Sequence, residues 1–282
     1  NILFRNKKRE IGNVVSCKTV IPTQYWAESV FPKEKNPLDK LWEIYFQITL
    51  ANVDDAIDKW NQRIDDIQNR VKYLDLQQFK SLIFITRKSR LDVELVENHK
   101  WTGGCEITNT GIRYMPNFPT QEIFTAPKKT GITGIMCNTK PLCYGGRIID
   151  DFQLNFENGK VIDYYPKDNH SIIDEIINLD ESNHYPGEIA ILPGETEISK
   201  TCVVFQSTLL DENAACHLAL GCAYPCSINH KTRFEKEEFE KLGLNYSNYH
   251  IDVMFGDDSI TIQAISKNNE IKLLMENGEW RV

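Results

Sequence analysis

Residues Arg147–Glu157 spell Arg-Ile-Ile-Asp-Asp-Phe-Gln-Leu-Asn-Phe-Glu, and Asn158-Gly159 then leads into Lys-Val-Ile-Asp-Tyr-Tyr at residues 160–165. Before the turn, apolar and polar side chains alternate from Phe152 to Phe156, with the two-residue period of a strand that has one buried face. Asn-Gly between two such runs favours a tight hairpin turn, because both residues tolerate positive φ. This stretch therefore predicts an antiparallel β-hairpin in a β-rich part of the chain.

Further short apolar runs lie on both sides of this hairpin. Upstream, Leu82–Thr86 is typical of a buried strand. Near the end of the chain the turn pairs Asp257-Asp258 and Asn268-Asn269 separate three more runs, which are Ile251–Phe255, Ile260–Ile265 and Ile271–Leu274. Turn-forming pairs between apolar runs predict an antiparallel meander, and a second Asn-Gly pair, Asn277-Gly278, predicts a turn toward Trp280.

The first third of the chain has the period of helices. Pro37–Leu50 is a plausible helix, and Asn52 is positioned to cap a second one. In this second stretch apolar side chains recur at helical spacing with charges between them, at Val53, Ala56, Ile57, Trp60, Ile64, Ile67, Val71 and Leu74. Such a stripe is far more often a packing face than a cofactor site.

Two shorter helices are predicted between the β-rich stretches. One covers about Ile172–Leu179. The other begins at Asp211, a good N-cap residue, and ends near Gly221, which suits the position after a helix. We therefore predict an α+β (mixed α/β) fold, with a helix-rich segment at residues 1–80 and a β-rich domain at residues 81–282.

The composition excludes several classes of protein. The 282 residues carry 40 acidic and 32 basic side chains, a net charge of −8, whereas a nucleic-acid-binding protein usually presents a basic surface. The short basic cluster Lys7-Lys8-Arg9 is better explained as solvated surface. No apolar run approaches the length of a membrane span. We therefore expect neither a nucleic acid nor a membrane as a partner.

The N-terminus and the cysteines bear on the compartment. Charged side chains already occur within the first ten residues, where a signal peptide would continue into an apolar run, so we predict no signal peptide. The first residue is Asn rather than Met, which suggests a fragment or a processed form. Several of the eight cysteines, among them Cys137 and Cys202, lie in apolar runs where a free thiol behaves as a small hydrophobic side chain. These features predict a reducing, cytoplasmic location.

The candidate functional residues are scattered, since the sequence contains no His-Glu-x-x-His, no Gly-x-Ser-x-Gly, no phosphate-binding Gly-rich loop and no dinucleotide fingerprint. The most informative pattern is His250-Ile251-Asp252. Residues i and i+2 of a strand share a face, so His250 and Asp252 would project together as a suitable pair of ligands for a divalent cation. For an isolated pattern of this kind, a polar outer strand face is the more common explanation.

The stretch Asp211–Gly221 places one histidine, His217, in an otherwise apolar Ala/Leu helix. Such a histidine is more often a core residue than a ligand. Cys216 precedes it, but neighbours on a helix point about 100° apart, so the two cannot form a nucleophile–base pair.

Two acidic residues complete the set of candidates. Glu188 follows a Pro-Gly turn and precedes an apolar strand, so it can lie at the mouth of that strand. Glu122 lies in a loop that contains proline. Taken singly, both are ordinary surface carboxylates.

Together these stretches resemble the thermophilic aminopeptidase family, also called the M29 or aminopeptidase T/S family. In chain order, the resemblance is carried by Asn117-Phe-Pro-Thr-Gln-Glu-Ile-Phe-Thr125, Gly187-Glu-Ile-Ala-Ile-Leu192, Thr208-Leu-Leu-Asp-Glu-Asn-Ala-Ala-Cys-His-Leu-Ala-Leu-Gly221 and Asn245-Tyr-Ser-Asn-Tyr-His-Ile-Asp252. The third of these is highly specific. Weaker similarity runs from Pro22-Thr23 to Gly278-x-Trp280, so the resemblance spans nearly the whole chain but lacks the family's N-terminal region.

The resemblance implies that residues 81–282 form a metal-binding catalytic domain with two divalent ions. The implied site residues are the ligands Glu122, Glu188, His217, His250 and Asp252, the further acidic residue Glu212 at the metals, and the active-site tyrosine Tyr224. Gln121 departs from the family, because a second acidic residue is expected there. The implied partners are peptides with a free N-terminus and a second copy of the chain in a homodimer.

A charge argument also supports two ions. Four carboxylates, on Glu122, Glu188, Glu212 and Asp252, would repel one another, and two divalent cations would neutralise them. Zinc, cobalt and manganese all suit such ligands. The hypothesis is metal-dependent hydrolysis of the N-terminal peptide bond by an activated water. Glu188 or Glu212 would carry its proton to the leaving amine, and Tyr224 would donate a hydrogen bond to the oxyanion.

Three alternatives stay open. In the first, the chain is an inactive or incomplete fragment that binds metal or peptide without turnover. In the second, it is a peptide-binding or structural protein whose site has decayed. In the third, it holds a structural zinc site built from Cys222, Cys226, His217 or His230. A Cys-x3-Cys spacing without a second cysteine pair is a weak pattern for zinc.

Overall fold

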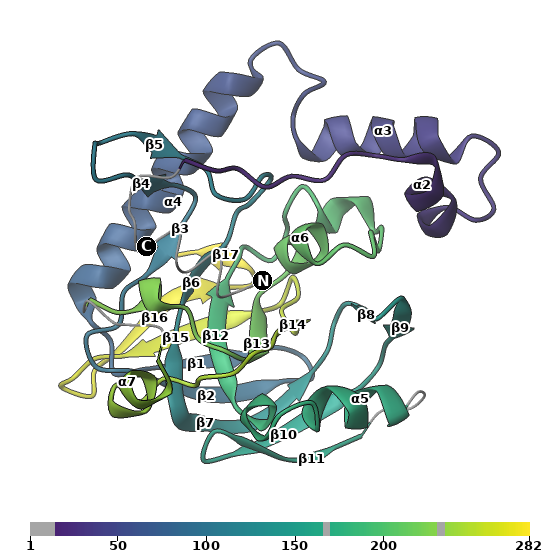
Figure 1. The fold of residues 1–282 in the computed structure, drawn as a ribbon. Coiled ribbons are helices and arrows are strands. Elements are labelled where there is room, and N and C mark those ends of the chain that lie inside the picture. The colour runs from purple at the N-terminus through teal and green to yellow at the C-terminus, as the bar shows by residue number, and fades with distance from the viewer. Residues whose placement is uncertain (1–14, 166–169, 230–234) are drawn as a thin grey trace.

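The computed structural model describes residues 15–165, 170–229 and 235–282, and most of its strands belong to two antiparallel sheets (Figure 1). The larger sheet has, in spatial order, β11 (Lys160–Tyr164), β10 (Gln153–Glu157), β7 (Pro127–Cys137), β2 (Arg90–Leu95), β1 (Ser81–Ile85), β15 (Thr261–Ile265), β16 (Ile271–Glu276) and β17 (Glu279–Trp280). The smaller sheet has β14 (His250–Met254), β13 (His217–Gly221), β12 (Pro186–Ile191), β6 (Ile123–Thr125) and β3 (Thr102–Gly103). Together with the helices these sheets confirm the predicted α+β fold.

Shorter elements lie between the strands of these sheets along the chain. Two small hairpins pair β4 (Glu106–Ile107) with β5 (Arg113–Tyr114) and β8 (Leu142–Tyr144) with β9 (Arg147–Ile149). The helices are α2 (Gln24–Val30), α3 (Pro37–Ile48), α4 (Ala56–Gln77), α5 (His170–Ile177), α6 (Thr208–Asp211) and α7 (Lys236–Lys241). The helices predicted at Pro37–Leu50 and Ile172–Leu179 are thus confirmed as α3 and α5. The basic cluster Lys7-Lys8-Arg9 lies outside the described residues.

The turn chemistry of the β10–β11 hairpin is as predicted. Asn158 and Gly159 have φ values of 49° and 78°, the positive values that a type I′ turn needs at both central positions. A Cβ on Gly159 would lie 1.9 Å from the carbonyl oxygen of Lys129, so this position accepts only glycine. Asn277 and Gly278 make the corresponding turn between β16 and β17, with φ values of 49° and 73°.

The predicted C-terminal meander is only partly right. β15, β16 and β17 form it, but β14 belongs to the smaller sheet and pairs with β13, with Ala219 opposite Asp252. An alternating pattern shows which face of a strand is buried and does not show which strand it pairs with, since partners far apart in sequence leave no local signal.

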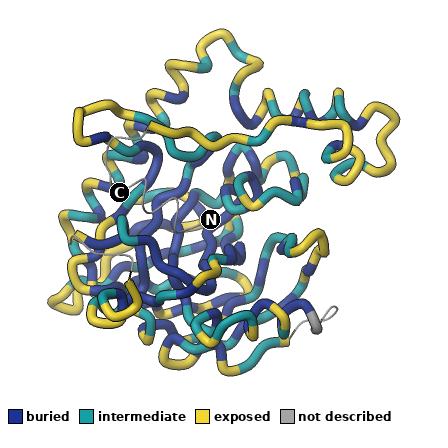
Figure 2. The backbone as a smooth tube through the Cα atoms, in the orientation of Figure 1, coloured by how far each residue is buried: buried dark blue, intermediate teal, exposed yellow. Residues whose placement is uncertain are grey.

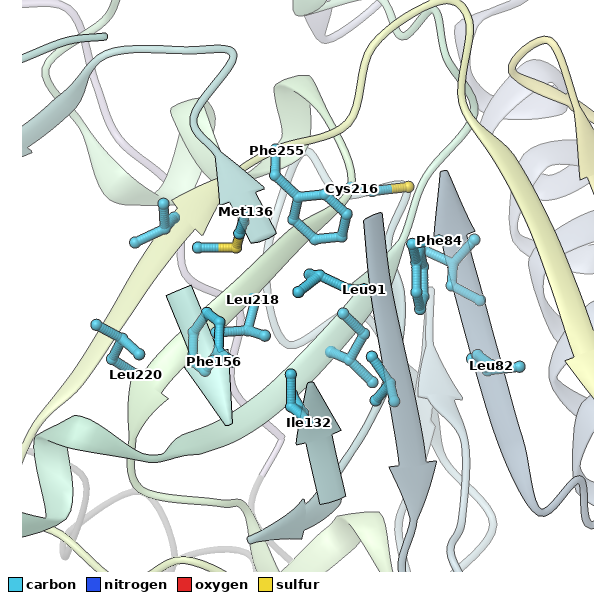
Figure 3. Close-up of a cluster of buried hydrophobic side chains, with 14 of the residues drawn as sticks. Leu82, Phe84, Leu91, Ile132, Met136, Phe156, Cys216, Leu218, Leu220 and Phe255 are labelled. Carbon is cyan, nitrogen blue, oxygen red and sulfur yellow. The ribbon is translucent and has the colours of Figure 1, made fainter. Parts of the chain in front are cut away.

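The two sheets share one apolar core (Figure 3). Leu82 and Phe84 enter it from β1, whereas Leu218 and Leu220 enter it from β13. Their side chains are buried almost completely. In Figure 2 the central part of the chain trace is mostly dark blue, that is buried, and the yellow, exposed segments lie around it. Burial of apolar surface by both sheets is therefore the main stabilising contribution.

Helix α4 buries its apolar stripe against this same core through Ile67, Val71 and Leu74. The stripe begins later than predicted, because Ile57 is 77% exposed. The N-cap position is Asp55 rather than Asn52, and its side chain makes no capping hydrogen bond. Helix α4 and the strands share one core. The division into residues 1–80 and 81–282 therefore separates a helix-rich part of the chain from a β-rich part, and a domain boundary between them remains a prediction.

Helices α2 and α3 pack elsewhere. They form a second, smaller core with residues that precede and include α6, among them Ile198, Phe205 and Leu210. In Figure 1 the two helices lie at one end of the molecule, above α6 and apart from the larger sheet. They therefore support the segment that leads into β13.

The helix predicted from Asp211 to Gly221 is wrong. Helix α6 ends at Asp211, a 3-10 turn covers Glu212–Ala214, and His217–Gly221 is strand β13. The Asp211 carboxylate does not cap a following helix, since it accepts hydrogen bonds from the backbone N–H groups of Phe205 (2.8 Å) and Ser207 (3.0 Å). All five residues of β13 are buried, and a short apolar run of that kind is ambiguous between a helix and a central strand until its neighbours are known.

No helix among the described residues is both long enough and apolar enough to cross a membrane.

We predict that Leu91→Ala lowers the free energy of unfolding by about 2–5 kcal/mol, because it removes a fully buried side chain from the shared core and leaves a cavity. The control is Ile135→Ala on β7, whose side chain is 45% exposed and whose loss should cost less than about 1 kcal/mol. Urea unfolding of both variants measures the difference. Equal destabilisation by the two changes would contradict the shared core.

Candidate metal centre

The two-residue period of the smaller sheet places its polar side chains on one face. On β12, β13 and β14 the shared core takes Ile189, Ile191, Leu218, Leu220, Ile251 and Val253. The residues between them must point to the opposite face. These residues include Glu188, His217, His250 and Asp252, and Glu122 takes the same face just before β6. One alternation across neighbouring strands therefore gathers all five side chains.

Strand register brings these side chains to the same level. Glu188 on β12 lies opposite Ala219 on β13, and Ala219 in turn lies opposite Asp252 on β14. His250 lies opposite Gly221. Since neighbouring strands are roughly 4.8 Å apart, side chains that rise from such positions can touch.

Glu188 is the centre of the arrangement. Its Oε1 lies 3.6 Å from Nε2 of His217, and its Oε2 lies 3.7 Å from Nε2 of His250. On one side Glu122 Oε2 lies 3.5 Å from the same His217 nitrogen, and on the other Asp252 Oδ1 lies 3.2 Å from the same His250 nitrogen. Two groups suited to a cation result, Glu122–Glu188–His217 and Glu188–His250–Asp252, and they share Glu188.

The backbone orients both imidazole rings. Nδ1 of His217 lies 3.2 Å from the carbonyl oxygen of Ala215, and Nδ1 of His250 lies 2.8 Å from that of Cys222. A carbonyl can only accept, so Nδ1 carries a proton and Nε2 is the ring atom that faces the carboxylates, where it either binds a cation through its lone pair or carries a second proton. This is the arrangement in which a histidine binds a metal through Nε2. The His217 Nε2 is also buried and has no hydrogen-bond partner in the described part of the chain.

The charges of the cluster shift its protonation. Burial and the carboxylates of Glu188 and Asp252 raise the pKa of Glu122 to about 7. Burial lowers the pKa of His217, but Glu188, Asp252 and Glu122 outweigh it and raise this pKa to about 9. For His250 burial also lowers the pKa, whereas Asp252 and Glu188 raise it to about 9. Without a cation the cluster therefore holds protons in its place.

A cavity of about 690 Å³ opens onto the cluster, within the range of small-ligand sites. Glu122, Glu188, His250 and Asp252 line it, whereas His217 lies fully buried beneath. Glu212 also lines the cavity but belongs to neither cation-binding group.

Tyr224 lies on the cavity wall and packs on His250. The two ring centroids are 4.6 Å apart, and Phe124 makes an edge contact with Tyr224 at 6.1 Å. Phe124 was not among the predicted site residues, although it lies two residues after Glu122 and therefore on the same face of the strand, a position that the two-residue alternation indicates.

Gln121 and the cysteine side chains lie apart from the cluster. Gln121 lines a different cavity from Glu122, so its departure from the family does not alter the cluster. Cys216 packs in the shared core, where burial raises the pKa of its thiol to about 12, so it does not act as a nucleophile. Among the described residues neither cation-binding group contains a cysteine, and His230 lies outside the described residues, so the structural zinc site has no support.

A sequence model of the thermophilic metalloprotease (M29) family matches residues 4–280. The chain belongs to this family. Its relatives include Aminopeptidase 2 of Geobacillus stearothermophilus, which is 38% identical over 262 residues, or 92% of this chain and 63% of that protein. Aminopeptidase AmpS of Bacillus subtilis is 36% identical over 257 residues, with 90% of this chain and 63% of that protein covered.

The fold agrees with this family. The solved structure described as wild-type AmpT from Thermus thermophilus is 32% identical and superposes with a TM-score of 0.84, covering 91% of this chain and 62% of that one. The chain thus spans less than two thirds of the length of these relatives.

We predict that the stability of the metal-free protein falls as pH rises from about 4.5 to about 9. Glu122 has its pKa raised from 4.5 to about 7, and the two histidines have theirs raised from 6.5 to about 9. At these three groups the folded state therefore binds more protons than the unfolded state throughout this window, so their contribution to stability decreases as pH rises. Urea unfolding in excess chelator at several pH values measures this slope.

His250→Asn should flatten the upper part of the slope because one of the raised groups is gone. His184→Asn, a histidine outside the cluster, should leave the profile unchanged and serves as the control. A metal-free stability that rises between pH 6 and 9 would contradict the described electrostatics.

Proposed function

We propose that the chain carries the active site of a metal-dependent aminopeptidase, which hydrolyses the N-terminal peptide bond of peptides with the help of two divalent cations. The observation that carries this proposal is the position of Glu188, whose two carboxylate oxygens face two different histidines in two groups of cation ligands. Membership of a family named for metalloproteases, with relatives named as aminopeptidases, supports it.

The residues present fit two cations better than one. Each group offers two carboxylates and one imidazole, and Glu188 can bridge because it belongs to both. The buried Nε2 of His217 also favours a cation, since it lies 3.5 and 3.6 Å from the carboxylates of Glu122 and Glu188 without a hydrogen bond to either, and a metal–ligand bond would satisfy it. Zinc, cobalt and manganese remain the ions that this mixed donor set suits.

The residues outside the two groups would handle protons and the oxyanion. Bound divalent cations supply Lewis-acid activation of water and of a carbonyl oxygen. Since both oxygens of Glu188 face histidines, we assign the general base to Glu212, which lines the cavity beyond the two groups. Its carboxylate would take the proton of the attacking water and pass it to the leaving amine. Tyr224, held on His250, would donate a hydrogen bond to the oxyanion.

The requirement for a free N-terminus belongs to the same proposal. With two cations bound, the four carboxylates that line the cavity are neutralised, so the free amino group of a peptide would be recognised by a cation or by a carboxylate that no cation engages, which would make the enzyme an exopeptidase. A homodimer and a cytoplasmic location, implied by the family resemblance and by the cysteine content, belong to this proposal as well.

Removal of metal should abolish hydrolysis of aminoacyl p-nitroanilides and lower the melting temperature, because the clustered carboxylates lose their counter-charge. Metal analysis before chelation should find about two divalent ions per chain, the number that the two groups imply. Addition of zinc, cobalt or manganese to the chelated protein should restore both properties. A metal-free protein with unchanged activity and unchanged melting temperature would contradict the proposal.

Glu188→Gln and Glu212→Gln should fail in different ways. The first removes the carboxylate that both groups share, so metal affinity should fall by at least about a hundredfold. The second leaves both groups intact, so metal content should stay near wild type while kcat falls by roughly 10²–10⁴-fold. Exposed Glu195, replaced by Gln, is the matched control. Metal loss in Glu212→Gln would refute the assignment of the base.

A further inference from the structure

Two parts of the candidate metal centre come from segments without regular strand or helix structure. Glu122 is the last residue of the stretch 118–122, which lies outside any strand, and Glu212 begins the 3-10 turn Glu212–Ala214. Loops of this kind are held less firmly than strands, so something must fix the distance between the two carboxylates across the cavity.

Asn213 joins the two segments. Its side chain is fully buried, and its Oδ1 accepts hydrogen bonds from the backbone N–H of Gln121 (2.8 Å) and from Oγ1 of Thr120 (3.1 Å). The residues that these bonds connect are 92 and 93 positions apart in the sequence. One amide oxygen therefore holds the residues immediately before Glu122 against the residue immediately after Glu212.

The other atoms of Asn213 anchor it to its own side of the cavity. Its Nδ2 donates to the carbonyl oxygen of Leu209 (3.2 Å), and its backbone carbonyl accepts from Oγ1 of Thr196 (2.9 Å). Two donors on Oδ1 and an acceptor on Nδ2 also define which way the amide points. Since every polar atom of this buried side chain is used, removing it would leave buried partners unsatisfied.

Both walls that Asn213 connects face the cavity. Thr120 and Glu122 line it from one side, and Thr208, Leu209 and Glu212 line it from the other. We propose that Asn213 is a positioning residue, which sets the separation of Glu122 in the first cation-binding group from Glu212, the proposed general base. This inference rests on the proposed function for the role of Glu212, and on geometry alone for Glu122.

The position predicts an uneven effect on the two groups. Asn213 is tied to the segment of Glu122, whereas His250 and Asp252 belong to strand β14 and receive their support from the sheet. Replacing Asn213 with Ala should therefore weaken the binding of one ion and leave the other near wild type. A loss of stability alone would weaken both or neither.

The experiment compares Asn213→Ala with Asn138→Ala. Asn138 is also buried and uses its amide fully, with Asp150, Lys140 and the backbone N–H of Phe152, but its partners do not line the cavity. Calorimetric titration of the chelated proteins with Zn²⁺ measures the two affinities, and steady-state kinetics on an aminoacyl p-nitroanilide separates kcat from KM.

For Asn213→Ala we expect one of two Zn²⁺ affinities to fall by about tenfold or more and kcat to fall by roughly 10–100-fold, since small displacements of reacting groups are costly. Asn138→Ala should lose comparable melting temperature with both affinities and kcat unchanged. If Asn213→Ala does not fold, Thr120→Val removes one of the two bonds to Oδ1, together with the 3.4 Å bond that Oγ1 of Thr120 accepts from the backbone N–H of Glu122, and should weaken the same ion roughly fivefold.

Wild-type affinities in Asn213→Ala or Thr120→Val, or equal losses in Asn138→Ala, would overturn the inference. Failure of the proposed function looks different, because a wild-type chain that binds two ions without hydrolysing peptides would reject Glu212 as a base and still show the selective loss of one ion in Asn213→Ala.

Discussion

The two sheets pack against one apolar core, so one face of the smaller sheet is apolar. The polar side chains of its strands must therefore lie on the opposite face. This constraint builds the candidate metal centre. The leucines and isoleucines of β12, β13 and β14 supply the burial that stabilises the fold, and the positions between them carry Glu188, His217, His250 and Asp252. A shift of register by one residue would bury the carboxylates in the core and expose the leucines, so stability and site geometry depend on the same pairing.

The electrostatic consequence is a cluster that cannot remain ionised without counter-charge. Three carboxylates and two imidazoles meet within one small volume, and the raised pKa of Glu122 and of both histidines shows that protons take the role of counter-charge when no cation is bound. Hydrogen bonds from Nδ1 to backbone carbonyls hold each ring with Nε2 toward the carboxylates. Protonation and metal binding are therefore competing solutions to one physical problem.

The proposed chemistry divides between strands and loops. Strands hold the central carboxylate and both histidines, since a paired backbone keeps these atoms within the narrow distances that coordination requires. Glu212 and Tyr224, assigned here to proton transfer and oxyanion binding, come from the turns that flank β13. Asn213 and the packing of the Tyr224 ring against His250 supply the rigidity that these turns lack.

Local patterns alone determined the hairpin at Asn158-Gly159, the long helix that ends at Gln77, the α+β class, and the shared strand face of His250 and Asp252, because these depend on periods of two and 3.6 residues and on turn residues. The specific amino-acid sequence of residues Asp211–Gly221 indicated the family and, through the family, the other site residues. Tertiary structure decided that His217 lies on a strand, that β14 leaves the meander to pair with β13, and that Glu188 lies between two histidines. The physical reason is that strand partners far apart in the chain are selected by packing against a common core, and that choice has no signature in any short window of sequence.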